Sequence, residues 1–397
     1  MKKILLSAII AFLAIGLYAQ DTAQVEPKVK LELVWKKEFE YPGADFIIDI
    51  NEEGEPKIKV IAFIKEQGKE SLIRFMDKKG KLLRETRGNA EYYGSRVLIS
   101  KDGEYIGISS VAKGDPEFIY EVDFDVYDKD GNYVWGQKGM NVRPFRLLSD
   151  ATILSYEGFG WQKFTLHNKN GLIDSISPIQ AEGTGACDIS KNNYIVFNVH
   201  DVNRNEGYVV LYNGIGKEIW HKKFDWRHTS KVVISDYGEY IAAIGKSSEG
   251  RMLSIISHKG DLLWQFHSGN CYYMDFSPES KYFVAGINLN EICLFESATG
   301  RILWKYKLSD KRSFFSIAVS NNGEFVTAAD GGGRRELPSG DTSTIYLFDK
   351  KGNIVWQKDL KIQKERAPHV RFTDDGKYLI ICNSNKLYCY KIAGGGQ

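Results

Sequence analysis

One recurrent turn limits what this chain can fold into more than any other feature. It has the form apolar-aromatic-[Asp/Asn/Ser]-x-x-Gly, as at Asp77–Gly80, Asp128–Gly131 and Asp349–Gly352. The Asp or Asn caps the local backbone, and the Gly accepts the positive φ that closes a short hairpin with a bulge. The glycines of seven such turns lie 51, 40, 45, 44, 40 and 52 residues apart, which predicts a series of β-hairpin repeats.

Tryptophan follows this turn at a fixed distance. In five copies a Trp stands four residues after the Gly, on the strand that leaves the turn. A Trp at one position in repeat after repeat is more typical of a packing wedge between neighbouring sheets than of a ligand site. The five residues are Trp135, Trp220, Trp264, Trp304 and Trp356, and Trp35 stands in a matching stretch.

A second turn alternates with the first, with the form [Ser/Thr]-x-x-[Gly/Asn/Ser]-x-[Tyr/Phe] before an apolar strand, as at Ser100–Tyr105 and Ser235–Tyr240. Eight copies of this turn stand against seven of the first, so the last repeat lacks an outer strand. Residues 31–39 resemble the other outer strands. We expect this N-terminal strand to complete the last repeat and close a ring, because closure removes open sheet edges.

The two turns together indicate eight four-stranded units. About 378 residues after a leader give about 47 per unit, which is the period of a propeller blade. We therefore predict an all-β, eight-bladed β-propeller that forms a single domain over residues 20–397, with residues 30–39 completing the last blade. The alternative is seven blades, because the third unit is short. The units are expected to start near residues 45, 95, 144, 186, 231, 272, 315 and 369.

The first 19 residues have the layout of a secretory signal peptide. Lys2 and Lys3 precede an apolar run over residues 4–17, and the segment ends on the small residue Ala19. The alternative is a membrane anchor, for which this run is shorter than the roughly 20 residues required. No Cys lies near the cleavage point to carry a lipid. We expect an exported protein, periplasmic or secreted, with no integral membrane segment after signal removal.

Charge and cysteine content exclude several classes of function. Lys and Arg number 53 against 51 Asp and Glu, and loss of Lys2 and Lys3 with the signal makes the two signs equal. This balance removes the electrostatic argument for nucleic acid. The cysteines are odd in number and lack C-x-x-C spacing, which favours apolar packing over a disulfide framework or a metal site. They are Cys187, Cys271, Cys293, Cys382 and Cys389.

The stretch Glu296-Ser-Ala-Thr-Gly300-Arg-Ile-Leu-Trp304 resembles the repeat of quinoprotein-like (PQQ-like) β-propellers, and Ser277-Pro-Glu-Ser-Lys-Tyr282 is similar to the inner hairpin of WD40-type propellers. The resemblance implies either a dehydrogenase that binds the quinone with Ca²⁺, often beside adjacent cysteines, or a binding protein. The binding members include the periplasmic scaffold of outer-membrane barrel assembly. This chain has no Cys-Cys pair, so no cofactor is expected, and PQQ or Ca²⁺ is an alternative without a supporting motif.

Motifs that carry catalysis are absent from the sequence. It has no Gly-x-Ser-x-Gly, His-Glu-x-x-His or P-loop. The dense acidic run Asp123, Asp125, Asp128 and Asp130 could bind calcium, or it could form a solvated strand and turn, which we favour.

Arginines and aromatic residues recur in the loops that enter each inner strand, on one face of the ring around the channel. Such side chains at a concave surface typically anchor partners or anionic ligands. The alternative is that they fill the space between blades and pair with nearby Asp or Glu. The candidates are Arg96, Arg143, Arg146, Trp226, Arg227, His228, Tyr273, Arg312, Arg334, Arg335, His369 and Arg371.

Two functions follow from this pattern. The first is a non-enzymatic binding or protein-interaction scaffold that uses this face to hold a protein or a small anionic ligand, as a monomer or as part of an envelope complex. The second is a propeller enzyme, either a PQQ-type oxidoreductase or a hydrolase or lyase acting on a sugar or peptide. The enzyme requires at least two carboxylates, or a His-carboxylate pair, converging at the channel mouth. The scaffold predicts that replacing Arg227 and Arg312 with Ala leaves folding intact and weakens capture.

Overall fold

The computed structural model describes residues 29–39, 43–50, 56–65, 70–77, 81–89, 96–114, 120–157, 163–178, 185–201, 203–309, 311–332, 342–361 and 368–393. The predicted signal peptide over residues 1–19 lies outside this part of the chain. Within it, no helix is long and apolar enough to span a membrane.

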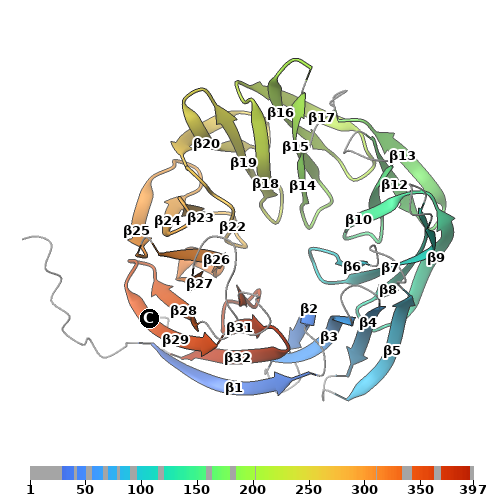
Figure 1. Cartoon of the computed structure of the whole chain (residues 1–397), viewed down its shortest axis with the longest axis horizontal. Helices are drawn as coiled ribbons and strands as arrows, with labels where there is room; N and C mark the ends of the chain where they lie inside the picture. Colours follow the sequence, from blue (N-terminus) through green and yellow to red (C-terminus); the bar gives the residue numbers. More distant parts are fainter. Residues whose placement is uncertain are drawn as a thin grey trace, which may run out of the picture.

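Eight four-stranded antiparallel sheets surround a central channel, which confirms the eight-bladed propeller and excludes the seven-bladed alternative (Figure 1). In seven blades the strands follow chain order from the channel outward. The single helical element of the described residues is a 3-10 turn, η1 (Asn321–Gly323).

The first four blades are built as follows. Blade 1 contains β2 (Gly43–Ile50), β3 (Pro56–Lys65), β4 (Glu70–Met76) and β5 (Leu82–Asn89). Blade 2 contains β6 (Arg96–Ile99), β7 (Tyr105–Gly114), β8 (Tyr120–Asp128) and β9 (Tyr133–Met140). Blade 3 contains β10 (Arg143–Leu147), β11 (Ile153–Glu157), β12 (Lys163–Asn168) and β13 (Gly171–Ile176). Blade 4 contains β14 (Ala186–Ile189), β15 (Ile195–Asp201), β16 (Glu206–Tyr212) and β17 (Glu218–Phe224).

The remaining blades complete the ring. Blade 5 contains β18 (His228–Ile234), β19 (Tyr240–Ser247), β20 (Gly250–Ser257) and β21 (Leu262–His267). Blade 6 contains β22 (Met274–Phe276), β23 (Tyr282–Ile287), β24 (Glu291–Glu296) and β25 (Ile302–Lys307). Blade 7 contains β26 (Arg312–Val319), β27 (Phe325–Gly332), β28 (Thr342–Asp349) and β29 (Ile354–Lys361). Blade 8 contains β30 (His369–Phe372), β31 (Tyr378–Asn383), β32 (Lys386–Ala393) and, as its outer strand, β1 (Lys30–Glu38).

The N-terminal strand closes the ring, as the count of turns predicted. β1 runs antiparallel to β32, from Lys30 opposite Ala393 to Glu38 opposite Lys386. The indole N–H of Trp35 then donates to the carbonyl oxygen of Pro56 in blade 1 at 2.6 Å. Blade 8 is therefore joined by hydrogen bonds both to the start of the chain and to the next blade.

The recurrent Gly and Trp form an interlock between consecutive blades. Gly300, in the outer turn of blade 6, adopts φ +70°, and a Cβ added to it would lie 2.6 Å from Cδ2 of Trp264 in blade 5. The indole N–H of Trp264 donates to the carbonyl oxygen of Ser297 in the same turn at 2.7 Å. The turn therefore needs Gly both for its positive φ and for the approach of the neighbouring ring. Trp264 is a packing wedge, as predicted.

A similar contact between a turn glycine and an aromatic ring lies closer to the channel. A Cβ added to Gly238, in the inner turn of blade 5, would lie 2.7 Å from Cδ2 of Tyr194 in blade 4. The same approach joins Gly323 of blade 7 to Tyr282 of blade 6. Blades 2, 5, 6 and 7 thus each seat an aromatic ring of the preceding blade against a turn glycine.

All five cysteines are buried and free, which agrees with their prediction as packing residues. Cys382 and Cys389 lie on paired strands but are not opposite each other, because Cys382 pairs with Leu387. Burial raises the pKa of the Cys271 and Cys293 thiols to about 12. Such thiols stay protonated at neutral pH and are poor nucleophiles.

Candidate functional site

The meander of each blade places its connections on two faces of the ring. Turns that join the first strand to the second, and the third to the fourth, lie on one face, which we call the turn face. Connections between the second and third strands, and between blades, lie on the opposite face, which we call the loop face. The predicted Arg and aromatic residues that the structure describes belong to the loop face or to the channel wall next to it.

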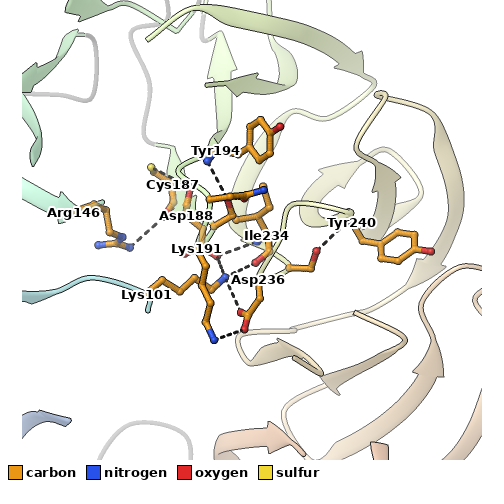
Figure 2. A network of polar contacts seen from close by, with 12 residues as sticks. Lys101, Arg146, Cys187, Asp188, Lys191, Tyr194, Ile234, Asp236 and Tyr240 are labelled. Carbon is orange, nitrogen blue, oxygen red and sulfur yellow. Dashed lines mark hydrogen bonds and ion pairs between the residues drawn. The ribbon is translucent and has the colours of Figure 1, made fainter. Parts of the chain in front are cut away.

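At the turn face, two lysines bridge the channel. Lys191 Nζ of blade 4 lies 2.9 Å from Asp236 Oδ2 of blade 5 and 3.2 Å from Asp374 Oδ2 of blade 8, on the opposite side of the ring. Lys101 Nζ of blade 2 donates to the carbonyl oxygen of Ile234 at 2.6 Å and lies 3.6 Å from Asp236 Oδ1. Figure 2 shows both lysines converging on Asp236.

Two inner-strand carboxylates extend this network. Asp188 Oδ2 accepts the backbone N–H of Ile234 at 2.9 Å, and Asp275 Oδ2 accepts that of Val319 at 3.1 Å. Burial raises the pKa of Asp275 to about 7, and the nearby charges of Asp236 and Asp188 add to the shift. Each carboxylate is held by the neighbouring blade or by a lysine, so the cluster ties blades together rather than offering a free acid or base. We call it the axial network; its members are Lys101, Asp188, Lys191, Asp236, Asp275 and Asp374.

The axial network was missed by sequence reasoning, although a signal for it exists. Lys101, Lys191, Asp236 and Asp374 are all the second residue of the recurrent inner turn. Because this position recurs at the tip of the hairpin nearest the channel, the charged residues of these four blades meet at the axis. The opposite charges at equivalent positions could have predicted their pairing.

The side chains of four predicted arginines lie outside the part of the chain that the structure describes. Arg96 begins β6 and Arg143 begins β10, and their side chains lie outside the described part of the structure. Arg334 and Arg335 lie wholly outside it.

Trp226 is buried rather than available to a partner. Its side chain is 2% exposed and stacks on Phe224, with ring centroids 4.1 Å apart. A Cβ added to Gly245 would lie 2.0 Å from Trp226 Cδ2, and one added to Gly207 would lie 2.7 Å from Trp226 Cβ. Only glycine at these two positions leaves room for the Trp226 ring. Trp226 therefore anchors the loop between blades 4 and 5 instead of contacting a ligand.

Arg312 is also engaged inside the protein. Its Nε donates to Asp330 Oδ2 at 2.7 Å, and its Nη2 donates to Asp330 Oδ1. Asp330 is 0% exposed and also accepts from Thr344 N at 2.8 Å and from the Tyr346 hydroxyl at 3.0 Å. A buried carboxylate needs such a partner. Contrary to the sequence-based prediction, we expect Arg312→Ala to destabilise the fold, because it leaves the buried Asp330 unpaired.

Arg146 and Tyr273 face the protein as well. Arg146 Nη2 donates to the carbonyl oxygen of Cys187 at 3.2 Å (Figure 2). The Arg146 guanidinium also lies over the Phe145 ring. Tyr273 is half-buried, which raises its pKa, and Lys231 Nζ lies 5.6 Å from its ring centroid. For these residues the packing alternative describes the contacts better than ligand binding does.

The remaining candidates are exposed, but they do not form one site. Arg227 and His228 lie at the start of β18 in blade 5, whereas His369 and Arg371 lie on β30 in blade 8. Lys246 and Arg251 lie beside Arg227 and His228, because they flank the turn between β19 and β20. These two basic residues were not among those selected from the sequence. The sequence Lys-Ser-Ser-Glu-Gly-Arg could have predicted that these two side chains are cross-strand neighbours.

The Ca²⁺ of quinoprotein enzymes finds no matching set of ligands among the residues that the structure describes. Among these residues, no three His, Cys, Asp or Glu side chains converge as metal ligands. The acidic run of blade 2 is used structurally: Asp130 pairs with Lys59 Nζ at 2.6 Å, and Asp128 accepts turn N–H groups.

Comparison with known proteins agrees with this architecture. A family model described as outer membrane protein assembly factor BamB matches residues 205–397. Among solved structures, the chain is similar to BamB from Moraxella catarrhalis, with 10% identity and a TM-score of 0.56 over 91% of this chain and 100% of that one.

A structure titled as the eukaryotic initiation factor is similar at 13% identity, with a TM-score of 0.55 over 87% of this chain and 82% of that chain. No curated protein matches the sequence. At these identities the structural likeness shows the fold alone. The resemblance to PQQ-like β-propeller repeats is thereby confirmed, with the family match covering residues 205–397.

Proposed function

We propose that the protein is an exported, non-enzymatic β-propeller that captures a protein partner through its loop face, as part of an envelope complex. The observation that carries this proposal is the difference between the two channel ends. The turn face carries short, stereotyped turns, and Lys191 and Asp374 bridge its channel end. The loop face keeps exposed cationic and aromatic side chains, including Arg227 and Tyr272. Such residues anchor protein partners more often than Ser, Ala or Lys do.

The alternative of a propeller enzyme has less support in the described residues. The buried carboxylate Asp330, near the end of β27, already accepts hydrogen bonds from Arg312, Thr344 and Tyr346. The buried thiols have raised pKa values and cannot act as thiolates near pH 7. A general acid or base at the mouth would need a group free to exchange a proton with a substrate.

Export rests on the N-terminal pattern and on the resemblance. Lys2 and Lys3, the apolar run and Ala19 have the order of a signal peptide. The matching family model carries the name of an outer-membrane assembly factor, which describes that family and not this chain. A periplasmic location, with a partner in an envelope complex, is the setting that both observations favour.

The proposal is tested by affinity capture from the protein's own envelope fraction. The loop-face variant carries Tyr272→Ala and His369→Ala, and the matched turn-face variant carries Tyr237→Ala and Lys259→Ala. We expect the first pair to reduce partner recovery at least tenfold and the second pair to leave it within twofold, with unchanged circular dichroism for both. Equal recovery from both variants, or turnover of a substrate by the purified protein, would contradict the proposal.

A further inference from the structure

We propose that the loop end of blade 5 docks an acidic, extended segment of the partner protein. This inference rests on the proposed function, because it assigns the chemistry of the partner to one part of the loop face. The surface consists of Arg227, His228, Lys246 and Arg251, which we call the cationic row.

Strand register places three of these residues side by side. His228 of β18 pairs with Lys246 of β19, and Lys246 pairs with Arg251 of β20. Directly paired residues project from the same face of a sheet, and adjacent strands lie about 4.8 Å apart. The three side chains therefore form a line about 10 Å long across the end of the blade. His228 and Lys246 are exposed, and Arg251 is partly exposed.

Backbone contacts hold the row in place. The N–H of Arg227 donates to the carbonyl oxygen of Lys246 at 2.7 Å, and the N–H of Ser268 donates to that of Arg251 at 2.9 Å. Trp226, buried directly before Arg227, fixes the loop that leads into the row. The cations are therefore presented by rigid elements, which lowers the entropy that a ligand must overcome on binding.

The row is not neutralised within the described part of the chain. None of its four side chains forms an ion pair there, although the carboxylates Asp225 and Glu249 lie close in sequence. Like charges directly opposite each other on paired strands are destabilising. By contrast, the charge of Arg312 is matched by the buried carboxylate of Asp330. The unmatched charges of Arg227, Lys246 and Arg251 favour an anionic partner that supplies the missing charge.

An extended acidic peptide matches the row better than a nucleic acid does. Alternate residues of an extended chain project to the same side about 6.8 Å apart, so two or three carboxylates reach a line about 10 Å long. Tyr272 lies in the adjoining loop with 45% of its surface exposed and offers a flat apolar contact beside the charges. The chain as a whole is balanced in charge, so it has no general electrostatic attraction for a phosphate backbone.

The experiment measures binding of a fluorescein-labelled peptide of alternating Glu and Ser by fluorescence anisotropy. A peptide with Gln in place of Glu is the control ligand. The test variant carries Lys246→Glu and Arg251→Glu. The matched variant carries Lys217→Glu and Lys259→Glu, two exposed lysines of the turn face, so both proteins have the same net charge.

We expect the Glu peptide to bind the native protein, to lose at least tenfold in affinity with the row variant, and to stay within twofold with the matched variant. Raising the salt should weaken binding, because exposed charges are screened. Equal loss from both variants, binding of the Gln peptide with the same affinity, or no binding of the Glu peptide would overturn the inference. If capture by the loop face persists in that case, the proposed function stands and only the acidic docking segment is lost.

Discussion

The interlock between blades makes a quantitative prediction at Gly300. Replacement by Ala keeps a positive φ of +70° on a residue with a side chain, at a cost of about 1–2 kcal/mol. The new Cβ would also lie 2.6 Å from the Trp264 ring, and overpacking of this kind costs about 1–3 kcal/mol. Gly300→Ala should therefore lower the free energy of unfolding by about 2–5 kcal/mol.

Gly139 provides a matched control, since its φ is +63° and nothing lies within 4 Å of an added Cβ. Gly139→Ala should show only the backbone cost of about 1–2 kcal/mol. Chemical denaturation followed by circular dichroism measures both variants. Equal destabilisation by the two substitutions would refute the claim that the turn glycine exists to receive the neighbouring ring.

A double variant separates the two contributions further. With Trp264 replaced by Leu, Gly300→Ala should cost no more than Gly139→Ala, because the ring that opposes the new methyl group is gone. A clash cost that survives the loss of Trp264 would also contradict the interlock.

Three further predictions concern buried polar groups. Burial raises the folded-state pKa of Asp275 to about 7 from 3.8, so stability falls as pH rises from 3.8 to about 7 and then levels off. Asp275→Asn should therefore raise the melting temperature more at pH 8 than at pH 5. Burial lowers the pKa of His167 below 6.5, so stability is lost as pH falls below 6.5, and His167→Leu should flatten that decline in thermal melts. Arg312→Ala should lower the free energy of unfolding by about 3–5 kcal/mol in denaturant titrations, because it leaves Asp330 unpaired. A second change, Asp330→Ala, should recover part of that loss. An Arg312→Ala variant as stable as the native protein would contradict the pairing.

The architecture was predictable because its determinants are local and repeated. A turn glycine followed four residues later by Trp264 or Trp304 encodes both the hairpin and the contact with the next blade. The unequal count of the two turns predicted that β1 closes blade 8, and the structure confirms it. Each of these signals depends on a few neighbouring residues, so the sequence alone was sufficient.

The candidate site was less predictable because burial depends on distant residues. The burial of Trp226 depends on Gly207 and Gly245, which lie far along the chain and leave room for its ring. Arg312 was selected for its charge, yet Asp330 lies 18 residues away on the next strand and binds it. The β19–β20 turn indicates the pairing of Lys246 with Arg251, but the addition of His228 to the row depends on the register between β18 and β19.

The most direct test of the account compares two exposed tyrosines on opposite faces of adjoining blades. Tyr272 lies on the loop face and is 45% exposed, whereas Tyr237 lies on the turn face and is 59% exposed. A photo-crosslinking amino acid at each position, activated in the living cell, reports which face meets a partner. The account predicts a discrete crosslinked partner from position 272 and none from position 237. Crosslinks from position 237 alone, or the same products from both, would contradict capture by the loop face.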